Sequence, residues 1–441
     1  MELGRTKSVC PVCLRVIDAV RRGEKDAVYL DKRCPEHGEF SALIWEGSPR
    51  SYILWNKNNS AAETPVEPRA AEKGCPYDCG LCESHKRKGC CMLLELTDRC
   101  NLRCPVCFAS AGESRGGDLP MEEIERRYDL LLAHGAPFNI QLSGGEPTVR
   151  DDLPEIIAMG REKGFSFFQL NTNGLRLAED ASYAQKLKDA GLSCVFLQFD
   201  SLRDETYEML RGRALLSQKL RAVENCAAAG LGTVLVPVVA AGVNEDEVGD
   251  ILRFAVEHMP NVRGVHFQPL SYFGRCALPR PDRPVTIPRM LRLIERQTDG
   301  AMKCSDFSGG GAENPYCSFH ASYRLLPDGW LKAMPKRDGG GSCCCAGSDD
   351  SRLSVAEQWA LDNYGFSPDG AMEDTSALDD FLAELRRRTF TVSGMAFQDA
   401  WSFDLERVQR CHICEVDGEY GMVPFCAYNR TDINGKALYR K

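Results

Sequence analysis

Three closely spaced cysteines, Cys100, Cys104 and Cys107, constrain this chain more than any other feature of its sequence. Thiolates hold iron–sulfur clusters, and four of them normally close a cubane. Three thiolates on one short loop leave the fourth iron open to a ligand from outside the protein. The alternative is a structural zinc knuckle, but such sites normally have four ligands in two close pairs. The spacing therefore predicts an iron–sulfur cluster with one reactive iron.

Length and composition predict a globular protein of two or three domains. The chain has 441 residues, of which 43% are hydrophobic, so it can bury a sizeable core. Its longest weakly interrupted apolar run, residues 230–243, is too short to span a bilayer, and the N-terminus lacks a signal-peptide core. The net charge of −9 argues against a nucleic-acid partner, which normally requires a concentrated basic surface. We expect a cytoplasmic protein and leave peripheral membrane contact open.

The chain has 22 cysteines, and most of them stand in close groups. Without a secretion signal, such groups indicate metal ligation in a reducing compartment rather than disulfides. The first group has the spacing of a zinc-ribbon or rubredoxin-like site and lies within residues 1–57; its members are Cys10, Cys13, Cys34 and His37. Thiolates suit zinc and iron alike, so we expect one mononuclear ion of either metal.

A second group follows a proline- and alanine-containing linker, and together they occupy residues 58–91. Its four thiols could close around an auxiliary 4Fe–4S cluster; they are Cys75, Cys79, Cys82 and Cys90. His85 or Cys91 could replace Cys90 as the fourth ligand.

The last group is spread over residues 301–441, where we expect a second auxiliary cluster and a region that caps the substrate. Its members are Cys317, Cys411, Cys414 and Cys426. Cys194, Cys226 and Cys276 stand among apolar or small residues and are interpreted as buried fillers. No role is assigned to Cys343, Cys344 and Cys345.

Between these groups, residues 92–300 alternate short apolar runs with amphipathic stretches. Six strand–helix alternations predict an α/β domain with a parallel sheet and crossover helices. In barrels of this kind, reactive residues gather at the carboxyl ends of the strands, and the unusual polar motifs of this chain stand there. One of them, Ser143–Pro147 (SGGEP), follows the second predicted strand.

The three-cysteine loop and the GGEP motif together resemble the radical S-adenosylmethionine (SAM) superfamily. The resemblance implies a partial (β/α)6 barrel and a SAM molecule that chelates the open iron and is cleaved to a 5′-deoxyadenosyl radical. It also implies a SAM-binding set: Gly144, Gly145, Glu146, Pro147, Asn171, Asn173, Gln198, Asp200 and Ser201. One position departs from the superfamily, because Val106 stands where an aromatic residue is common before the third cysteine, and Phe108 follows it.

A narrower resemblance covers nearly the whole chain. Seven motifs occur in the order of the group that contains the archaeal tetraether lipid synthase and the methanogen pterin radical SAM methylase: CPVC with CPEHG, CPYDCGLCESH, DRCNLRCPVCFA, LSGGEPT, PLSYFGR, PYCSFHASY, and FDLERVQRC with VPFCAYN. This resemblance implies formation of a carbon–carbon bond at an unactivated carbon, with three 4Fe–4S clusters and a low-potential electron donor such as ferredoxin or flavodoxin.

The substrate is left as a choice between a lipid and another small molecule. The leading hypothesis is coupling of lipid chains, and the alternative is C-methylation of a pterin-like heterocycle. A lipid would need an apolar tunnel, for which the candidates are Phe381, Phe390, Met395, Phe397, Trp401 and Phe403, although such residues more often fill a core. A hypothesis of another class is an iron–sulfur electron carrier, which would need no SAM pocket.

Overall fold

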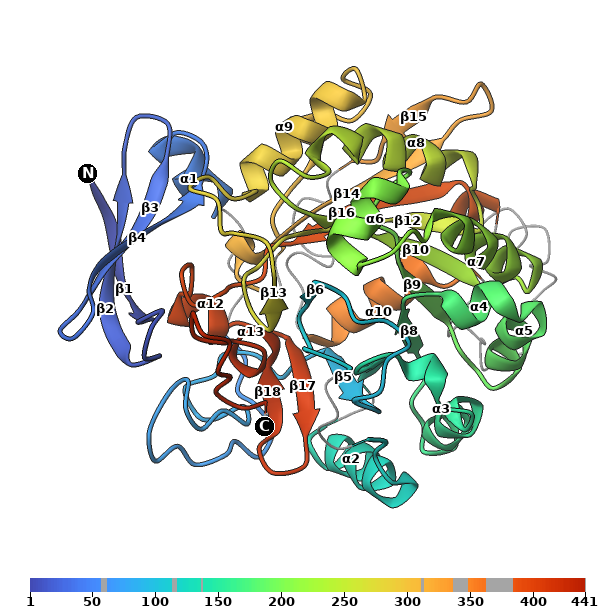
Figure 1. Ribbon diagram of the computed structural model, residues 1–441, viewed down its shortest axis with the longest axis horizontal. Coiled ribbons are helices and arrows are strands. Elements are labelled where there is room, and N and C mark those ends of the chain that lie inside the picture. The colour runs from blue at the N-terminus through green and yellow to red at the C-terminus, as the bar shows by residue number, and fades with distance from the viewer. Residues whose placement is uncertain are drawn as a thin grey trace, which may run out of the picture.

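Two main sheets organise the computed structural model, which describes residues 1–56, 62–112, 117–135, 138–310, 313–335, 348–361 and 384–440. Cys343, Cys344, Cys345 and Phe381 lie outside these residues. The first sheet is antiparallel and lies at one side of the molecule (Figure 1). Its strands follow chain order: β1 (Glu2–Val9), β2 (Val16–Gly23), β3 (Val28–Cys34) and β4 (Gly38–Trp45). In this order the β1–β2 and β3–β4 turns lie at the same end of the sheet, which places their cysteines together.

The second sheet has twelve strands, and six neighbouring parallel strands form the barrel wall. They are β5 (Cys91–Glu95), β7 (Asn139–Ser143), β8 (Phe168–Thr172), β9 (Cys194–Gln198), β10 (Gly232–Val236) and β12 (Val262–Pro269). Each corresponds to one of the six apolar runs from which a strand is predicted. The expectation of a partial (β/α)6 barrel is therefore confirmed.

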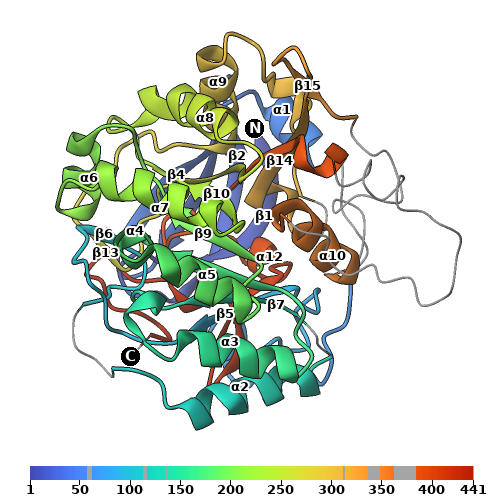
Figure 2. The ribbon, with the colours of Figure 1, turned by 90° about the vertical axis from the view of Figure 1, so that its right-hand side faces the viewer.

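Helices cover the outer face of these strands, as Figure 2 shows for α3, α5, α7 and α8. The set is α2 (Met121–Ala133), α3 (Leu153–Glu162), α4 (Leu175–Glu179), α5 (Ala181–Asp189), α6 (Asp204–Arg211), α7 (Leu216–Ala228) and α8 (Val248–Glu257). On α2 the buried residues Ile124, Tyr128 and Leu131 recur at helical spacing and face the sheet. The main core lies between this apolar stripe, its equivalents on the other helices and the outward-facing strand residues.

The C-terminal region continues the barrel sheet at both edges. At one edge β16 (Thr389–Met395) joins β12 in parallel, and β14 (Ser318–Leu325) and β15 (Leu331–Ala333) follow it. At the other edge β17 (Ile413–Asp417) joins β5 in parallel, and β18 (Gly421–Pro424) follows. The sheet thus crosses the domain boundary predicted after residue 300, although the division itself stays a prediction.

Short elements complete the described part of the chain: α1 (Pro49–Trp55), β6 (Val106–Cys107), β11 (Val238–Val239), β13 (Arg275–Cys276), α9 (Ile287–Gln297), α10 (Ser348–Trp359), α12 (Leu405–Val408), α13 (Phe425–Tyr428), and the 3-10 turns η1 (Pro147–Val149), η2 (Glu245–Glu247), η3 (Cys304–Asp306) and η4 (Pro315–Cys317). Within the described ranges, no helix combines the length and the apolar character needed to cross a membrane.

Candidate active site and metal centres

Of the cysteines of the predicted reactive cluster, Cys100 and Cys104 lie on the loop that joins β5 to β6, and Cys107 ends β6. Cys104 is buried, whereas Cys100 and Cys107 are partly exposed. Burial, together with Glu146 and the two neighbouring thiols, raises the pKa of Cys100 to about 12. A thiol that coordinates a metal is deprotonated nonetheless, because the positive charge of the metal outweighs the burial. Three thiols in mutual electrostatic contact are the donor set that three irons of a cubane require.

Two arginines hold the main chain of this cysteine loop. Arg211, the last residue of α6, donates from Nη1 to the Val106 carbonyl at 2.9 Å. Arg275, on β13, donates to the Cys104 carbonyl at 2.8 Å and to the Ala111 carbonyl at 2.9 Å. β13 also pairs with β6 in antiparallel register. The protein therefore fixes the conformation of the loop from two sides.

The two glycines of the GGEP motif let the chain after β7 approach the chain after β5. Gly144 has φ +123°, and a Cβ there would lie 2.5 Å from the Thr97 carbonyl oxygen. The Gly145 N–H donates to that same oxygen at 2.7 Å, and the Glu146 N–H donates to the Arg99 carbonyl at 2.9 Å. The motif thus pairs with the segment that leads into the cysteine loop.

Glu146 connects the ends of two strands. Its Oε1 accepts hydrogen bonds from Thr148 Oγ1 at 2.7 Å and from Thr172 Oγ1 at 2.6 Å, and its Oε2 accepts from the Asn173 N–H at 2.7 Å. Asn173 in turn donates from Nδ2 to Asn101 Oδ1, on the cysteine loop, at 2.7 Å. Glu146 and Asn173, two residues of the predicted SAM set, therefore lie against the predicted cluster site.

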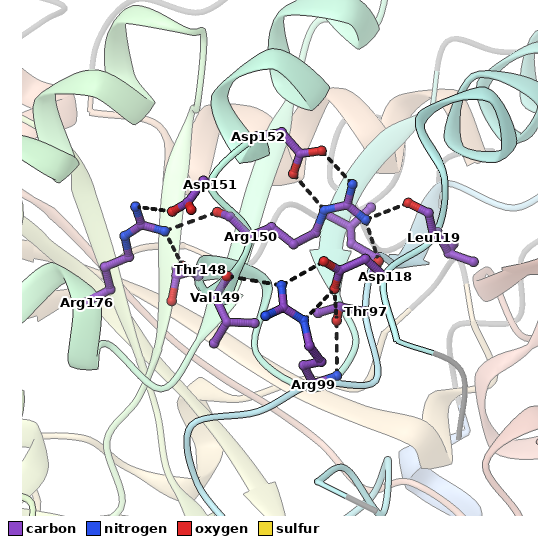
Figure 3. A network of polar contacts seen from close by, with 11 residues as sticks. Thr97, Arg99, Asp118, Leu119, Thr148, Val149, Arg150, Asp151, Asp152 and Arg176 are labelled. Atoms are coloured by element: carbon purple, nitrogen blue, oxygen red, sulfur yellow. Dashed lines mark hydrogen bonds and ion pairs between the residues drawn. The ribbon is translucent and has the colours of Figure 1, made fainter. Parts of the chain in front are cut away.

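A network of charged side chains links the same loops to one another (Figure 3). Arg99, which precedes the first cysteine, forms an ion pair with Asp118 at 2.6 Å. Arg150 is 3% exposed and donates to one main-chain carbonyl on each side of the cysteine loop, at 2.8 and 2.7 Å. Arg176, on α4, donates to the Thr148 carbonyl at 2.6 Å. The network joins the loops after β5, β7 and β8 into one unit.

The predicted SAM residues that follow β9 differ in accessibility. Gln198 ends β9 and is partly exposed. Asp200 is fully buried, and both of its carboxylate oxygens accept hydrogen bonds from Arg211 at 2.7 Å. Ser201 is also fully buried and donates to Glu247 at 2.5 Å. In this structure Asp200 and Ser201 therefore face protein partners, and Asp200 acts on the cysteine loop through Arg211.

Sequence reasoning did not identify three cations near this site: Arg211, Lys219 and Arg275. Lys219 is fully buried and donates to the Asn173 carbonyl at 2.5 Å. Burial lowers its pKa to about 8, and Asp200 opposes that shift. A signal was available, because Lys219 recurs with apolar residues at helical spacing on the buried face of α7. Arg275 lies in the PLSYFGR motif, to which no chemistry was assigned.

On the inner face of the barrel, β7, β8 and β12 carry polar side chains, whereas β9 and β10 contribute the apolar side chains of Phe196 and Val234. Outward-facing residues of β7 and β8 belong to the main core: Ile140, Leu142, Phe168 and Leu170. By strand alternation, Gln141, Gln169 and Asn171 face inward. Asn171 Nδ2 donates to Gln141 Oε1 at 3.3 Å and Gln169 Nε2 donates to Asn171 Oδ1 at 2.7 Å. On β12, His266 Nδ1 lies 2.9 Å from Ser393 Oγ of β16. Amide and imidazole groups therefore share this face with the ring of Phe196, whose centroid lies 5.9 Å from that of the His266 ring.

His266 makes the stability of the barrel depend on pH. Burial lowers its pKa to about 4, with Glu313 opposing the shift, whereas an unfolded chain has a histidine pKa near 6.5. Between these values the unfolded state binds more protons, so we expect the unfolding free energy to fall as the pH drops from 6.5 towards 4, by at most about 3 kcal/mol.

The measurement is anaerobic urea unfolding of wild type and of His266→Gln at pH 7, 6 and 5. His266→Gln should flatten the decline. His134→Gln, at the end of α2, is the control and should leave the slope as in wild type. An identical slope in wild type and His266→Gln would contradict the expectation.

The N-terminal sheet brings four metal-ligand side chains together at one end. The ligand atoms of Cys10, Cys13, Cys34 and His37 all lie within 4.8 Å of one another. Cys13 and Cys34 sulfurs are 4.0 Å apart, and His37 Nδ1 lies 3.4 Å from Cys34 Sγ. Three sulfurs and one imidazole nitrogen at this separation suit one tetrahedral ion.

We expect Cys34→Ser to remove about one equivalent of zinc or iron per chain and to lower the temperature at which the N-terminal sheet unfolds, because metal binding supplies folding free energy to small domains. Metal analysis and calorimetry test this. Cys304→Ser, at a cysteine on η3 away from the sheet, should leave the metal content unchanged. Equal metal content in Cys34→Ser and wild type would contradict the assignment.

The first predicted auxiliary group lies on the segment before β5. A hydrogen bond with Cys79 and burial, together with the thiols of Cys79 and Cys82, raise the pKa of Cys75. The Cys79 N–H donates to Tyr439 Oη at 2.8 Å, which fastens this segment to the C-terminal end of the chain. Cys90 immediately precedes β5 and is buried. The structure thus brings Cys75, Cys79 and Cys82 together, and the fourth ligand stays a prediction.

The last predicted group meets in space despite its spread in sequence. Burial raises the pKa of Cys411, and Cys426, Cys414 and Cys317 contribute as neighbouring thiols. Cys317 Sγ also accepts a hydrogen bond from Arg407 Nε at 3.3 Å. Cys317 ends η4 just before β14, Cys411 and Cys414 stand before and on β17, and Cys426 lies on α13, so the group joins segments from opposite edges of the barrel sheet.

The aromatic residues considered for an apolar tunnel pack as core. Phe390 and Phe403 are fully buried, in the main core and in a second core, respectively. Phe397 and Trp401 are partly buried and pack against neighbouring aromatic rings at centroid distances of 4.4 and 5.8 Å. These contacts fit the interpretation of this set as core rather than as tunnel lining.

Comparison with known families agrees with this geometry. The Radical SAM superfamily model matches residues 94–255, which hold the cysteine loop, the GGEP motif and most of the barrel. The model of the HMPTM N-terminal zinc ribbon domain matches residues 2–46. The fold and the site define a radical SAM enzyme with an N-terminal zinc ribbon, which implies a 4Fe–4S cluster and SAM. The hypothesis of a non-catalytic electron carrier is thereby set aside.

One relative is similar along almost its whole length. The chain is 35% identical to the 7,8-dihydro-6-hydroxymethylpterin dimethyltransferase of Methanocaldococcus jannaschii, across 96% of this chain and 93% of that protein. It therefore belongs to the radical SAM family of that enzyme.

Other matches cover less. The GTP 3′,8-cyclase of Paenarthrobacter nicotinovorans is 36% identical across 44% of this chain and 55% of its own length. Among solved structures, Streptococcus suis SuiB bound to S-adenosylmethionine aligns with a TM-score of 0.41 and 17% identity over 48% of this chain and 47% of that one.

Proposed function

We propose that this radical SAM enzyme methylates a carbon of a pterin-like heterocycle. The sequence analysis placed this reaction second, behind coupling of lipid chains. The relative that matches 96% of this chain is named as a pterin dimethyltransferase, and this favours the second hypothesis. The lipid hypothesis gains no support from the described tunnel candidates, because Phe390 and Phe403 are core residues and Phe397 packs against the second core.

The polar side chains that β7, β8 and β12 place on the inner face of the barrel are the observation that carries this proposal. Gln141, Gln169 and Asn171 offer amide donors and acceptors side by side, and His266 adds an imidazole held by Ser393. A fused-ring heterocycle presents a flat edge of N–H and carbonyl groups that such side chains can bind. These side chains already bond one another, but a lipid chain offers no partner to their further donors and acceptors, and a buried polar group left without a partner costs about 1–3 kcal/mol.

The residue assignments belong to the same proposal. Cys100, Cys104 and Cys107 hold the reactive cluster, which when bound supplies the electron that cleaves SAM. Gly144 to Pro147, Asn171, Asn173 and Gln198 contact SAM, while Asp200 and Ser201 position the site through Arg211 and Glu247. Two auxiliary clusters bring the total to three, and a ferredoxin or flavodoxin supplies electrons.

The test is anaerobic turnover of reconstituted enzyme with dithionite, SAM and a labelled one-carbon donor. Dihydro-hydroxymethylpterin and a polar lipid extract are supplied in parallel, and mass spectrometry quantifies 5′-deoxyadenosine and labelled products. We expect label in the pterin and stimulation of 5′-deoxyadenosine by the pterin only. Coupled lipid without label would instead restore the lipid hypothesis.

A matched pair of variants links the activity to the inner face. Gln141→Leu should raise the KM for the pterin at least tenfold and the KM for SAM much less, because Gln141 reaches the proposed SAM residues indirectly, through the hydrogen bond that it accepts from Asn171. Gln185→Leu, on the exposed face of α5, is the control. An unchanged pterin KM in Gln141→Leu would place the substrate elsewhere.

A further inference from the structure

Arg430 is a buried cation without a hydrogen-bond partner. Arg430 lies shortly after α13 and is 0% exposed. Among the described residues, no acceptor reaches Nε, Nη1 or Nη2. The guanidinium stacks on the ring of Phe403, 4.1 Å from the ring centroid. An uncompensated buried charge costs several kcal/mol, so this arrangement calls for an anion beside the guanidinium.

Two cysteine thiols lie among the neighbours of Arg430. Burial lowers the pKa of Arg430 to about 10, and Cys79 is the neighbour that opposes this most, with Cys75 also contributing. Lys32, a second buried cation, lies within electrostatic range. Its Nζ donates to three oxygen acceptors at 2.7 to 3.0 Å, so it is satisfied, whereas Arg430 is not. Cys79 shares the second core with Phe403, the ring beneath Arg430.

A comparison within the chain supports a sulfur partner. Arg407, which lies beside the other predicted auxiliary site, donates from Nε to Cys317 Sγ at 3.3 Å and from Nη2 to the Ala396 carbonyl at 2.7 Å. Each predicted auxiliary site therefore has a neighbouring guanidinium, fully buried at Arg430 and partly buried at Arg407. The one beside Cys317 already contacts its thiol, while the one beside Cys79 still has all of its N–H groups available.

We propose that Arg430 is the charge partner of the auxiliary cluster held by Cys75, Cys79 and Cys82, that it donates N–H···S hydrogen bonds to the sulfurs, and that it raises the reduction potential of that cluster. The guanidinium carries five donors in a fixed fork and stays protonated, which suits a multi-sulfur anion. A nearby cation stabilises the more negative, reduced state, and net charge and hydrogen bonds to sulfur set cluster potentials. The inference rests on the auxiliary-cluster assignment within the proposed function.

The test is a redox titration of the reconstituted full-length protein without substrate. Electron paramagnetic resonance measures the reduced cluster at each potential. A Cys104→Ala background removes the signal of the reactive cluster. The reference is the Cys104→Ala protein that keeps Arg430. At its midpoint potential, Arg430→Met should lower the ratio of reduced to oxidised auxiliary cluster at least tenfold, which is a fall in midpoint potential of about 59 mV for a one-electron couple. Arg430→Lys, which keeps the charge, should shift much less. Arg407→Met is the matched control and should shift the other auxiliary signal instead.

Each outcome decides the proposal. An unchanged midpoint in Arg430→Met overturns it, and so does loss of the cluster iron from Arg430→Lys as well as from Arg430→Met. If Arg430→Met alone loses the iron, Arg430→Gln replaces it in the titration, because glutamine keeps a hydrogen-bond donor but removes the charge. Arg430→Gln must then show a lowered midpoint potential. An unchanged midpoint potential in Arg430→Gln overturns the proposal. Wild type without any auxiliary signal overturns the assignment of the cluster. Because no pterin is present, failure of the methylation hypothesis appears only in the turnover experiment.

Discussion

Cys104→Ala should abolish 5′-deoxyadenosine formation and remove about four irons per chain. Cys104 is the most buried of the three cysteines, and its carbonyl is held by Arg275 at 2.8 Å. Alanine there leaves two thiolates on the loop, which cannot anchor three irons of a cubane. Without a cluster beside the SAM site there is no electron for SAM cleavage, so the loss should be complete rather than partial.

The measurement is 5′-deoxyadenosine by mass spectrometry after incubation with SAM and dithionite, alongside iron analysis. Cys226→Ala is the matched control, because Cys226 is fully buried in the main core on α7. It should retain the iron content and the 5′-deoxyadenosine rate of wild type. Product formation by Cys104→Ala at the wild-type rate would disprove the role given to the three-cysteine loop.

The barrel could be predicted because its strands and helices are encoded by local patterns. The run CVFLQFDS contains β9 in its first five residues, and the amphipathic run MEEIERRYDLLLAHG forms α2 except for its last two residues. In both cases the spacing of apolar residues decides which face is buried, and no distant contact is needed to settle the type of element.

The edges of the sheet could not be predicted in the same way. β16 pairs with β12, and β17 pairs with β5 across more than three hundred residues of sequence. An alternating run predicts a strand but not its partner, because pairing depends on which edge is open once the barrel has formed. For this reason the C-terminal region looked like a separate capping region.

Charged groups inside the fold escaped prediction for a related reason. Arg150 and Arg211 resemble ordinary surface residues in sequence, and their burial depends on carbonyl and carboxylate partners contributed by other loops. The candidate ligand cysteines were easier to predict, because their close spacing in the sequence is visible without any knowledge of the fold. The polar side chains of β7 and β8 could be assigned to the inner face of the barrel only when the register of the strands was known.

Asp200→Ala should destabilise the protein by about 3–5 kcal/mol, because it leaves Arg211 as a buried charge without its partner. The pair is 0% and 5% exposed, and both carboxylate oxygens accept hydrogen bonds from the guanidinium at 2.7 Å. Arg211 also holds the Val106 carbonyl in the cysteine loop. We therefore expect a second effect, a lower rate of 5′-deoxyadenosine formation at temperatures where the variant is still folded.

The control is Asp246→Ala, since Asp246 pairs with Arg203 on the same side of the barrel but the two side chains are 66% and 46% exposed. Exposed ion pairs contribute at most about 1 kcal/mol, so this variant should unfold in urea close to wild type. Anaerobic urea titrations of the three proteins, with the iron content checked in each, separate the two cases. Equal unfolding midpoints for Asp200→Ala and Asp246→Ala would mean that the buried pair is not what holds the cysteine loop to α6. A large difference, together with loosely bound iron in Asp200→Ala only, would show that this carboxylate acts through Arg211 rather than through contact with SAM.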